Sequence, residues 1–161
     1  MMLHFSHRTL ITISGLIWFS VGGMLLYKGL NFLVAASKAD GGSLWLNHLA
    51  TLVGGLELAV IVLVAIALLI GYLKGTRVLA KSADKGSNHI QSLPNPAPVH
   101  KMYKPGYFVL LAVMVGLGVA MNVFSVPLDV RGFVDTAVGA ALVNGSMVYF
   151  RKAVMLKALS L

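Results

Sequence analysis

Four long apolar stretches divide the chain. They cover about residues 9–33, 49–73, 107–124 and 132–150, and each holds at most one acidic residue. An α-helix needs roughly 20 mostly apolar residues to cross the hydrocarbon core of a bilayer, and each stretch approaches or exceeds that length. The pattern therefore predicts an all-α integral membrane protein. Its single membrane domain is a four-helix transmembrane bundle, with residues 74–106 linking the second and third spans.

The first apolar stretch has a rival interpretation as a cleavable signal peptide. Arg8 precedes it, as a charged residue precedes the apolar region of a signal. That region is only about 7 to 15 residues long in signal peptides, whereas residues 9–27 include no charge over 19 positions. We therefore favour a first transmembrane helix.

The basic residues are distributed unevenly between the two ends of the predicted spans. Ten lie near the termini or in linker 74–106: Arg8, Lys74, Arg77, Lys81, Lys85, Lys101, Lys104, Arg151, Lys152 and Lys157. Three lie toward the opposite ends of the spans: Lys28, Lys38 and Arg131. Lys and Arg near span ends stay in the cytoplasm, so both termini and the linker are predicted to be cytoplasmic in a multi-pass protein. The four spans then form two helical hairpins.

A weak internal similarity relates the two predicted hairpins. Placing residues 54–75 on residues 132–153 puts Glu57 opposite Asp135, but few of the paired positions are identical. Apolar segments match by chance at comparable levels, and the paired acids are the main reason to consider a duplication. A parallel pseudo-repeat is therefore a hypothesis from the sequence.

The composition narrows the class of protein further. The 161 residues are 58% hydrophobic and 11% charged, with no cysteine, whereas about a quarter of the residues in a soluble domain are charged. The lack of cysteine excludes a disulfide scaffold and any metal site with thiolate ligands. The net charge of +8 reflects the topology described above, and no aromatic stacking platform accompanies it. We therefore expect the lipid bilayer, and no nucleic acid, as a partner.

Motifs for catalysis or cofactor binding are missing from the sequence. A haem or metal site inside the bundle would need two histidines facing each other within the spans. The five histidines lie near span ends or in connections: His4, His7, His48, His89 and His100. The sequence also has no nucleotide-binding glycine loop and no HExxH motif. We expect no enzymatic activity, no cofactor and no bound metal.

Linker 74–106 begins with a basic stripe and ends in a proline-rich segment. Spacings of three and four residues place the stripe on one face of a helix that continues out of the second span: Lys74, Arg77, Lys81 and Lys85. We interpret it as topology-setting charge near lipid headgroups, with specific binding of an anionic lipid or a cytoplasmic partner as the alternative. Residues 92–105 hold four of the five prolines and predict an extended tether.

Small residues line one face of every predicted span. In the last three spans they recur at every fourth position: Ala67, Gly71 and Gly75; Ala112, Gly116 and Ala120; and Ala137, Ala141 and Gly145. In the first span, Gly15, Gly22 and Gly23 leave one face without bulky side chains. Such ridges let helix backbones approach closely where lipid supplies no hydrophobic drive for association. They predict close packing within the bundle or between chains, and hence a homo-oligomer or a second membrane subunit.

Two carboxylates fall inside the predicted spans. Glu57 lies about eight residues from the outer end of its span and Asp135 about three. A charge at the centre of a spanning helix costs about 2.5 to 3.5 kcal/mol on insertion scales, so it rarely faces lipid. The simplest interpretation neutralises each acid: Glu57 by protonation or by pairing with Lys28 or His48, and Asp135 by pairing with Arg131.

The functional interpretation makes Glu57 a proton-titrating or cation-binding group in the membrane. Asn122, Asn144 and Ser146 on other spans would be its polar neighbours, and Asp135 is a further candidate for binding the ion or solute. On this hypothesis the chain is a transporter or channel, or a transporter subunit, for an ion or small solute. The alternative is a noncatalytic structural or assembly subunit of a larger membrane complex. Small-residue ridges and basic cytoplasmic ends suffice for that role.

Overall fold

A computed structural model of the chain describes residues 4–39, 43–98, 101 and 105–158, although not the side chains of residues 4, 44, 97, 105–111 and 115. The elements in chain order are β1 (His4–Phe5), α1 (His7–Lys38), α2 (Leu44–Val53), α3 (Leu56–Lys74), the π-helical segment η1 (Gly75–Leu79), α4 (Ala80–Gln91), β2 (Ala97–Pro98), α5 (Pro105–Val123) and α6 (Leu128–Ala158).

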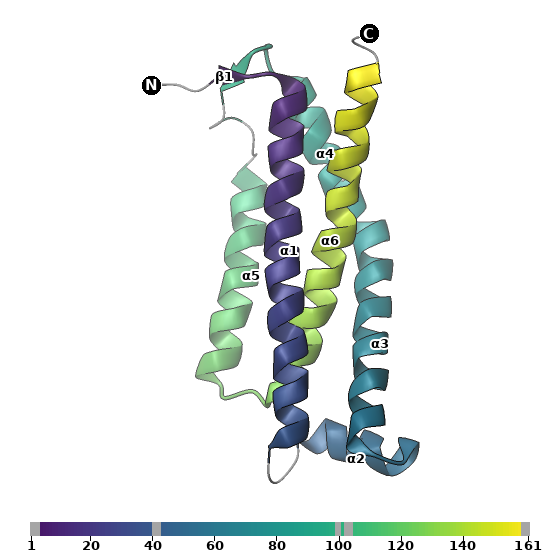
Figure 1. The fold of residues 1–161 in the computed structure, drawn as a ribbon. Coiled ribbons are helices and arrows are strands. Elements are labelled where there is room, and N and C mark those ends of the chain that lie inside the picture. Colours follow the sequence, from purple (N-terminus) through teal and green to yellow (C-terminus); the bar gives the residue numbers. More distant parts are fainter. Residues whose placement is uncertain (1–3, 40–42, 99–100, 102–104, 159–161) are drawn as a thin grey trace.

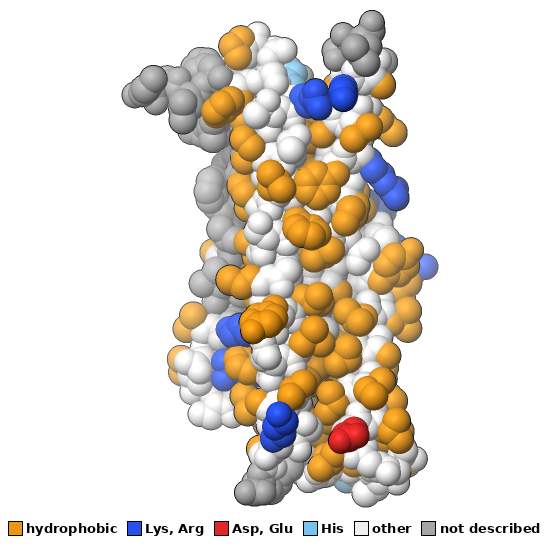
Figure 2. Space-filling model, viewed as in Figure 1, with side chains coloured by type: hydrophobic (Ala, Val, Ile, Leu, Met, Phe, Trp, Pro, Cys, Tyr) orange, Lys and Arg blue, Asp and Glu red, His pale blue; other side chains and the backbone are white. Residues whose placement is uncertain are grey.

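Within the part of the chain that the structure describes, three helices are long and apolar enough to cross a membrane. These are α1, the continuous helix Leu56–Gln91 that joins α3, η1 and α4, and α6. Hydrophobic side chains cover the visible face along its whole length, and only scattered charged side chains interrupt them (Figure 2). The third predicted span corresponds to α5, whose first seven side chains lie outside the description, so the fourth spanning helix stays a prediction.

The long helices lie side by side, and the two ends of the bundle differ (Figure 1). At one end, which we call the terminal end, lie the start of α1, the end of α6 and α4. At the other, the loop end, α2 lies across the bundle and the α5–α6 connection turns. The start of α1, the end of α6 and α4 therefore share one end of the described structure.

Helix α6 packs along α1 through glycine backbones. Gly15, Gly22 and Gly29 recur at every seventh position of α1 and are all buried. A Cβ on Gly22 would lie 2.9 Å from the carbonyl oxygen of Gly139, and one on Gly29 would lie 2.8 Å from that of Gly132. The two helices run in opposite directions (Figure 1). Backbone contact over this length requires residues without side chains, which explains why glycine occupies these positions.

Helix α3 packs on α6 through its own small-residue ridge. A Cβ on Gly71 would lie 2.5 Å from the carbonyl oxygen of Ala137, and one on Gly75 would lie 2.7 Å from that of Ala141. The ridges predicted in the second and fourth spans therefore meet each other inside the chain. The ridge predicted in α5 makes no such close contact with another described helix at Gly116. A Cβ on Gly116 would have no described atom within 4 Å.

The predicted division into two hairpins is not confirmed, and neither is the pseudo-repeat. Helix α1 packs along α6 for most of its length and only slightly along α3. Because α6 also packs along α3, it is the helix that α1 and α3 share. The backbone contacts described above explain this preference, since the glycines of α1 match the small residues of α6.

The second apolar stretch is not one helix, which corrects the sequence prediction. Helix α2 ends at Val53, and Gly54 takes the left-handed conformation at φ +88° while its N–H donates to the carbonyl oxygen of Ala50. Only glycine adopts this conformation without strain, so the Gly54–Gly55 pair breaks the run and α3 begins at Leu56. Half-exposed Trp45 of α2 lies at the loop end, as expected for an interfacial helix.

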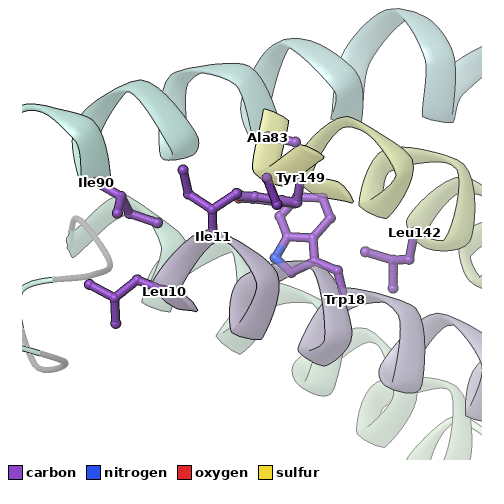
Figure 3. Close-up of a cluster of buried hydrophobic side chains, with 8 residues drawn as sticks. Leu10, Ile11, Trp18, Ala83, Ile90, Leu142 and Tyr149 are labelled. Atoms are coloured by element: carbon purple, nitrogen blue, oxygen red, sulfur yellow. The ribbon is translucent and has the colours of Figure 1, made fainter. Parts of the chain in front are cut away.

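A buried apolar cluster holds α1, α4 and α6 together at the terminal end (Figure 3). Leu10 and Ile11 of α1 meet Ile90 of α4, and the Trp18 and Tyr149 rings pack edge to face at 5.5 Å. Beyond α4, the proline-rich segment is tied to the start of the chain, because β2 pairs antiparallel with β1. The predicted extended tether is therefore anchored in its first part.

Candidate functional site

A cavity of about 420 Å³ lies between α1, α5 and α6. Its polar lining consists of Lys28, Asn122, Arg131 and Asp135. The remaining lining is apolar except for one glycine backbone: Val21, Met24, Leu25, Met114, Leu117, Gly118, Val119, Met121, Val134 and Val138. Three charged side chains therefore converge on one cavity among helices that are otherwise largely apolar.

Arg131 and Lys28 share one aromatic ring beside the cavity. The Arg131 guanidinium carbon lies 4.9 Å from the centre of the Phe32 ring, and Lys28 Nζ lies 5.4 Å from it. Arg131 Nη1 also donates to Asn122 Oδ1 at 3.3 Å, which joins α6 to the end of α5. The negative face of an aromatic ring attracts cations. Phe32 therefore stabilises two like charges in the same place.

Asp135 is the carboxylate of this site. It lies one turn beyond Arg131 in α6, is only 7% exposed, and is within electrostatic range of Lys28 and Arg131. The predicted direct ion pair between Asp135 and Arg131 does not form in the described part of the chain, where the ion pair found is Lys152 with Asp84. With one carboxylate against two cations, the ionised site has an excess of one positive charge.

The other predicted polar residues lie elsewhere. Asn144 donates from Nδ2 to the Ala140 carbonyl oxygen at 2.8 Å and packs against Gly75 at the α3–α6 contact. It does not line the cavity. The two amides were predicted as neighbours of Glu57. Asn122 instead lines the cavity with Asp135, and Asn144 donates to the backbone of its own helix.

Glu57 lies apart from the cavity. It is exposed in the first turn of α3, directly after the Gly54–Gly55 break. The prediction that it lies two turns inside a continuous helix is wrong, because the helix begins at Leu56. Among the described residues no ion pair joins Glu57 to Lys28 or to His48, which is exposed on α2.

Two residues that the sequence reasoning missed lie near this end of α6. Phe32, beneath the two cations, had no signal in the sequence, because one aromatic in an apolar run is ordinary. Asp129 is fully buried in the first turn of α6, and its Oδ1 accepts from the Val130 N–H at 2.7 Å. An acid just after Pro127 could have been identified as a helix N-terminal residue, where the helix dipole favours a carboxylate.

The basic stripe lies on the helix that continues beyond α3, as predicted. All four of its side chains are exposed: Lys74, Arg77, Lys81 and Lys85. Beside the stripe, Asp84 lies three residues after Lys81 in α4 and pairs with Lys152 of α6 at 2.5 Å, and Lys152 also donates to Asn88 Oδ1 at 2.6 Å. Exposed basic side chains near a membrane suit anionic headgroups.

Comparison of the chain with protein-family models, with curated proteins and with solved structures finds no match. The described residues contain no group of three or more side chains that could hold a metal ion. The cavity and its charges are therefore the basis of the functional argument.

Proposed function

We propose that this chain is a small multi-pass membrane protein that binds an ion or small solute in the cavity between α1, α5 and α6. It then acts as a transporter or channel, or as a subunit of one. One observation carries the proposal: Lys28, Arg131 and Asp135 converge on a cavity beside α1 and α6, two of the helices that are long and apolar enough to span a membrane. Arg131 and Asp135 lie near the start of α6, where a charge costs less than at the centre of a spanning helix, for which insertion scales give about 2.5 to 3.5 kcal/mol. The convergence of three charged side chains on one cavity is what indicates a use.

In this proposal Asp135 takes the role that the sequence suggested for Glu57. Asp135 is buried and lines the cavity, whereas Glu57 is exposed at a helix end. Lys28 and Arg131 bind or gate the solute, and Asn122 orients Arg131 by accepting its N–H. The proposal includes α5 as a fourth spanning helix, because α5 supplies one wall of the cavity.

Flux through reconstituted vesicles tests the proposal. Wild-type protein is screened against small anions and cations, and Asp135→Asn and Lys28→Gln are compared with it. We expect both variants to lower flux at least about tenfold, since a charged hydrogen-bonding partner contributes about 1.5 to 3 kcal/mol. Glu57→Gln is the matched control because it removes an exposed carboxylate outside the cavity. Wild-type flux in both cavity variants contradicts the proposal, and no flux of any solute contradicts a transporter or channel formed by this chain alone.

The noncatalytic subunit remains a second candidate because of α5. Its small residues Ala112 and Gly116 are exposed, and a Cβ on Gly116 or Gly118 would have no described atom within 4 Å. Such a face suits a helix of another copy or another subunit. If the chain is only a subunit, no solute moves, and Gly116→Leu changes the oligomeric state or complex recovered in mild detergent.

A further inference from the structure

We propose that the ligand of the cavity is an amphipathic anion, with one carboxylate or phosphate group attached to a hydrocarbon chain. This inference rests on the proposed function, because it specifies the solute of the same cavity. Two properties of the lining carry it: the sign of the charge and the separation of polar from apolar walls.

The charge of the lining favours an anion. Lys28 and Arg131 against Asp135 leave an excess of one positive charge, and both cations are held at one ring, that of Phe32. Among the described contacts Arg131 donates one side-chain hydrogen bond, from Nη1 to Asn122 Oδ1. A guanidinium that lines a cavity together with an ammonium is suited to the oxygens of a carboxylate or phosphate.

The walls of the cavity separate polar from apolar groups along the bundle. Asn122 and Arg131 lie at the loop end of α5 and α6, and Lys28 faces them from α1. The α1 residue Val21 lies seven positions nearer the terminal end, which is about 10 Å at helical rise. Met114 and Val138 continue the apolar lining from α5 and α6 in the same direction. A ligand with its anionic group at Arg131 therefore places any chain against apolar walls.

The size of the cavity suits a small organic molecule better than a bare ion. About 420 Å³ is within the range of roughly 300 to 1,000 Å³ typical of sites for small organic molecules. An inorganic anion would contact the polar end and leave the walls of Val21, Met114 and Val138 uncovered. A hydrocarbon chain covers them and gains van der Waals contact with their side chains.

Competition binding tests the inference. Purified full-length protein in a neutral maltoside detergent is incubated with radiolabelled decanoate, and unlabelled competitors are added. We expect displacement by dodecyl phosphate, and none by acetate, inorganic phosphate or decyltrimethylammonium at tenfold higher concentration. Phosphatidic acid distinguishes two sources of the same chemistry: displacement indicates a membrane lipid, and failure to displace indicates a free single-chain anion.

Matched variants locate the two parts of the ligand. Lys28→Gln and Arg131→Gln should each weaken decanoate binding about 10- to 100-fold. Gly118→Leu should also weaken it at least about tenfold, because Gly118 lines the cavity and has open space for a side chain. Gly23→Leu is the control: a Cβ on Gly23 of α1 also has no described atom within 4 Å, but Gly23 lies outside the lining, so this variant should leave binding unchanged. Elution volume and helical content verify folding of each variant.

The outcomes separate this inference from the proposed function. If acetate or inorganic phosphate competes as well as dodecyl phosphate, the ligand is a small anion; the amphipathic ligand is then overturned while the proposed function stands. Equal binding by Gly118→Leu and Gly23→Leu also overturns the inference, since the hydrocarbon chain of the ligand then does not occupy this cavity. If decanoate does not bind and Lys28→Gln leaves the flux of every solute unchanged, both proposals fail.

Discussion

Gly22 of α1 and Gly139 of α6 each face the other's backbone. A Cβ on Gly22 would lie 2.9 Å from the Gly139 carbonyl oxygen, and a Cβ on Gly139 would lie 2.7 Å from the Gly22 carbonyl oxygen. A backbone atom cannot move aside for an added methyl group as the flexible end of a side chain can. The close approach of these helices therefore depends on both residues remaining glycine.

Gly22→Ala should lower the free energy of unfolding by about 1 to 3 kcal/mol, because the added methyl group forces the two backbones apart. The matched control is Gly23→Ala, where a Cβ would have no described atom within 4 Å. That control should leave stability unchanged or raise it by up to about 1 kcal/mol through the helix propensity of alanine. Unfolding in mixed micelles, followed by circular dichroism, measures both. Equal stability of the two variants contradicts the packing described here.

The pair should also be energetically coupled. Once Gly22→Ala has separated the helices, Gly139→Ala in the same chain meets a wider gap, so the double variant should lose less than the sum of the single losses. We expect a coupling energy of about 0.5 to 3 kcal/mol from a double-mutant cycle. Additive losses would show that the two substitutions act at independent places.

At the terminal end, apolar burial should matter more than the ion pair. Ile90 is 1% exposed within its cluster, so Ile90→Ala should cost about 2 to 5 kcal/mol. Lys152→Gln should cost less than about 1 kcal/mol, because the Asp84 side chain is 51% exposed. The rate of proteolytic cleavage between residues 80 and 98 reports how often α4 detaches. Faster cleavage in Lys152→Gln than in Ile90→Ala would contradict the prediction that apolar burial contributes more than the ion pair.

The proposed topology, with the termini and linker in the cytoplasm, can be tested with introduced cysteines, since the chain has none. Asn95 follows α4 and Asn47 lies on α2, and both are exposed. A membrane-impermeant maleimide should label Asn95→Cys only from the cytoplasmic side and Asn47→Cys only from the opposite side. Labelling of both from the same side rules out this topology.

Several features of the fold were predictable from the sequence because they depend on local composition. The ridge of Gly71 and Gly75 was predicted to pack closely and does so against α6. The equivalent ridge at Gly116 shows no such contact among the described residues. Spacing identifies a face on which a helix can be approached, but it does not specify which helix approaches. That choice depends on the matching of two surfaces far apart in the chain.

The candidate site was predictable only in its residue types. Lys28 and Arg131 were predicted as partners of two different acids, whereas the structure places both with Asp135 at one cavity. The error about Glu57 has a local cause, because apolar residues continue across Gly54 and conceal the break before α3. A hydropathy pattern reports how readily a stretch of residues is buried. It does not detect a helix break made by a single residue in the left-handed conformation.

The position of α6 between α1 and α3 has a consequence for biogenesis. Gly139 is synthesised more than a hundred residues after Gly22, which at about 5 to 20 residues per second is a delay of at least about 5 to 20 s. During that interval the glycine face of α1 has no matching helix from its own chain. Insertase and chaperone proteins, or the lipids themselves, must cover this face until α6 enters the bilayer, and a ribosome stalled before α6 would leave the nascent chain without its principal contact.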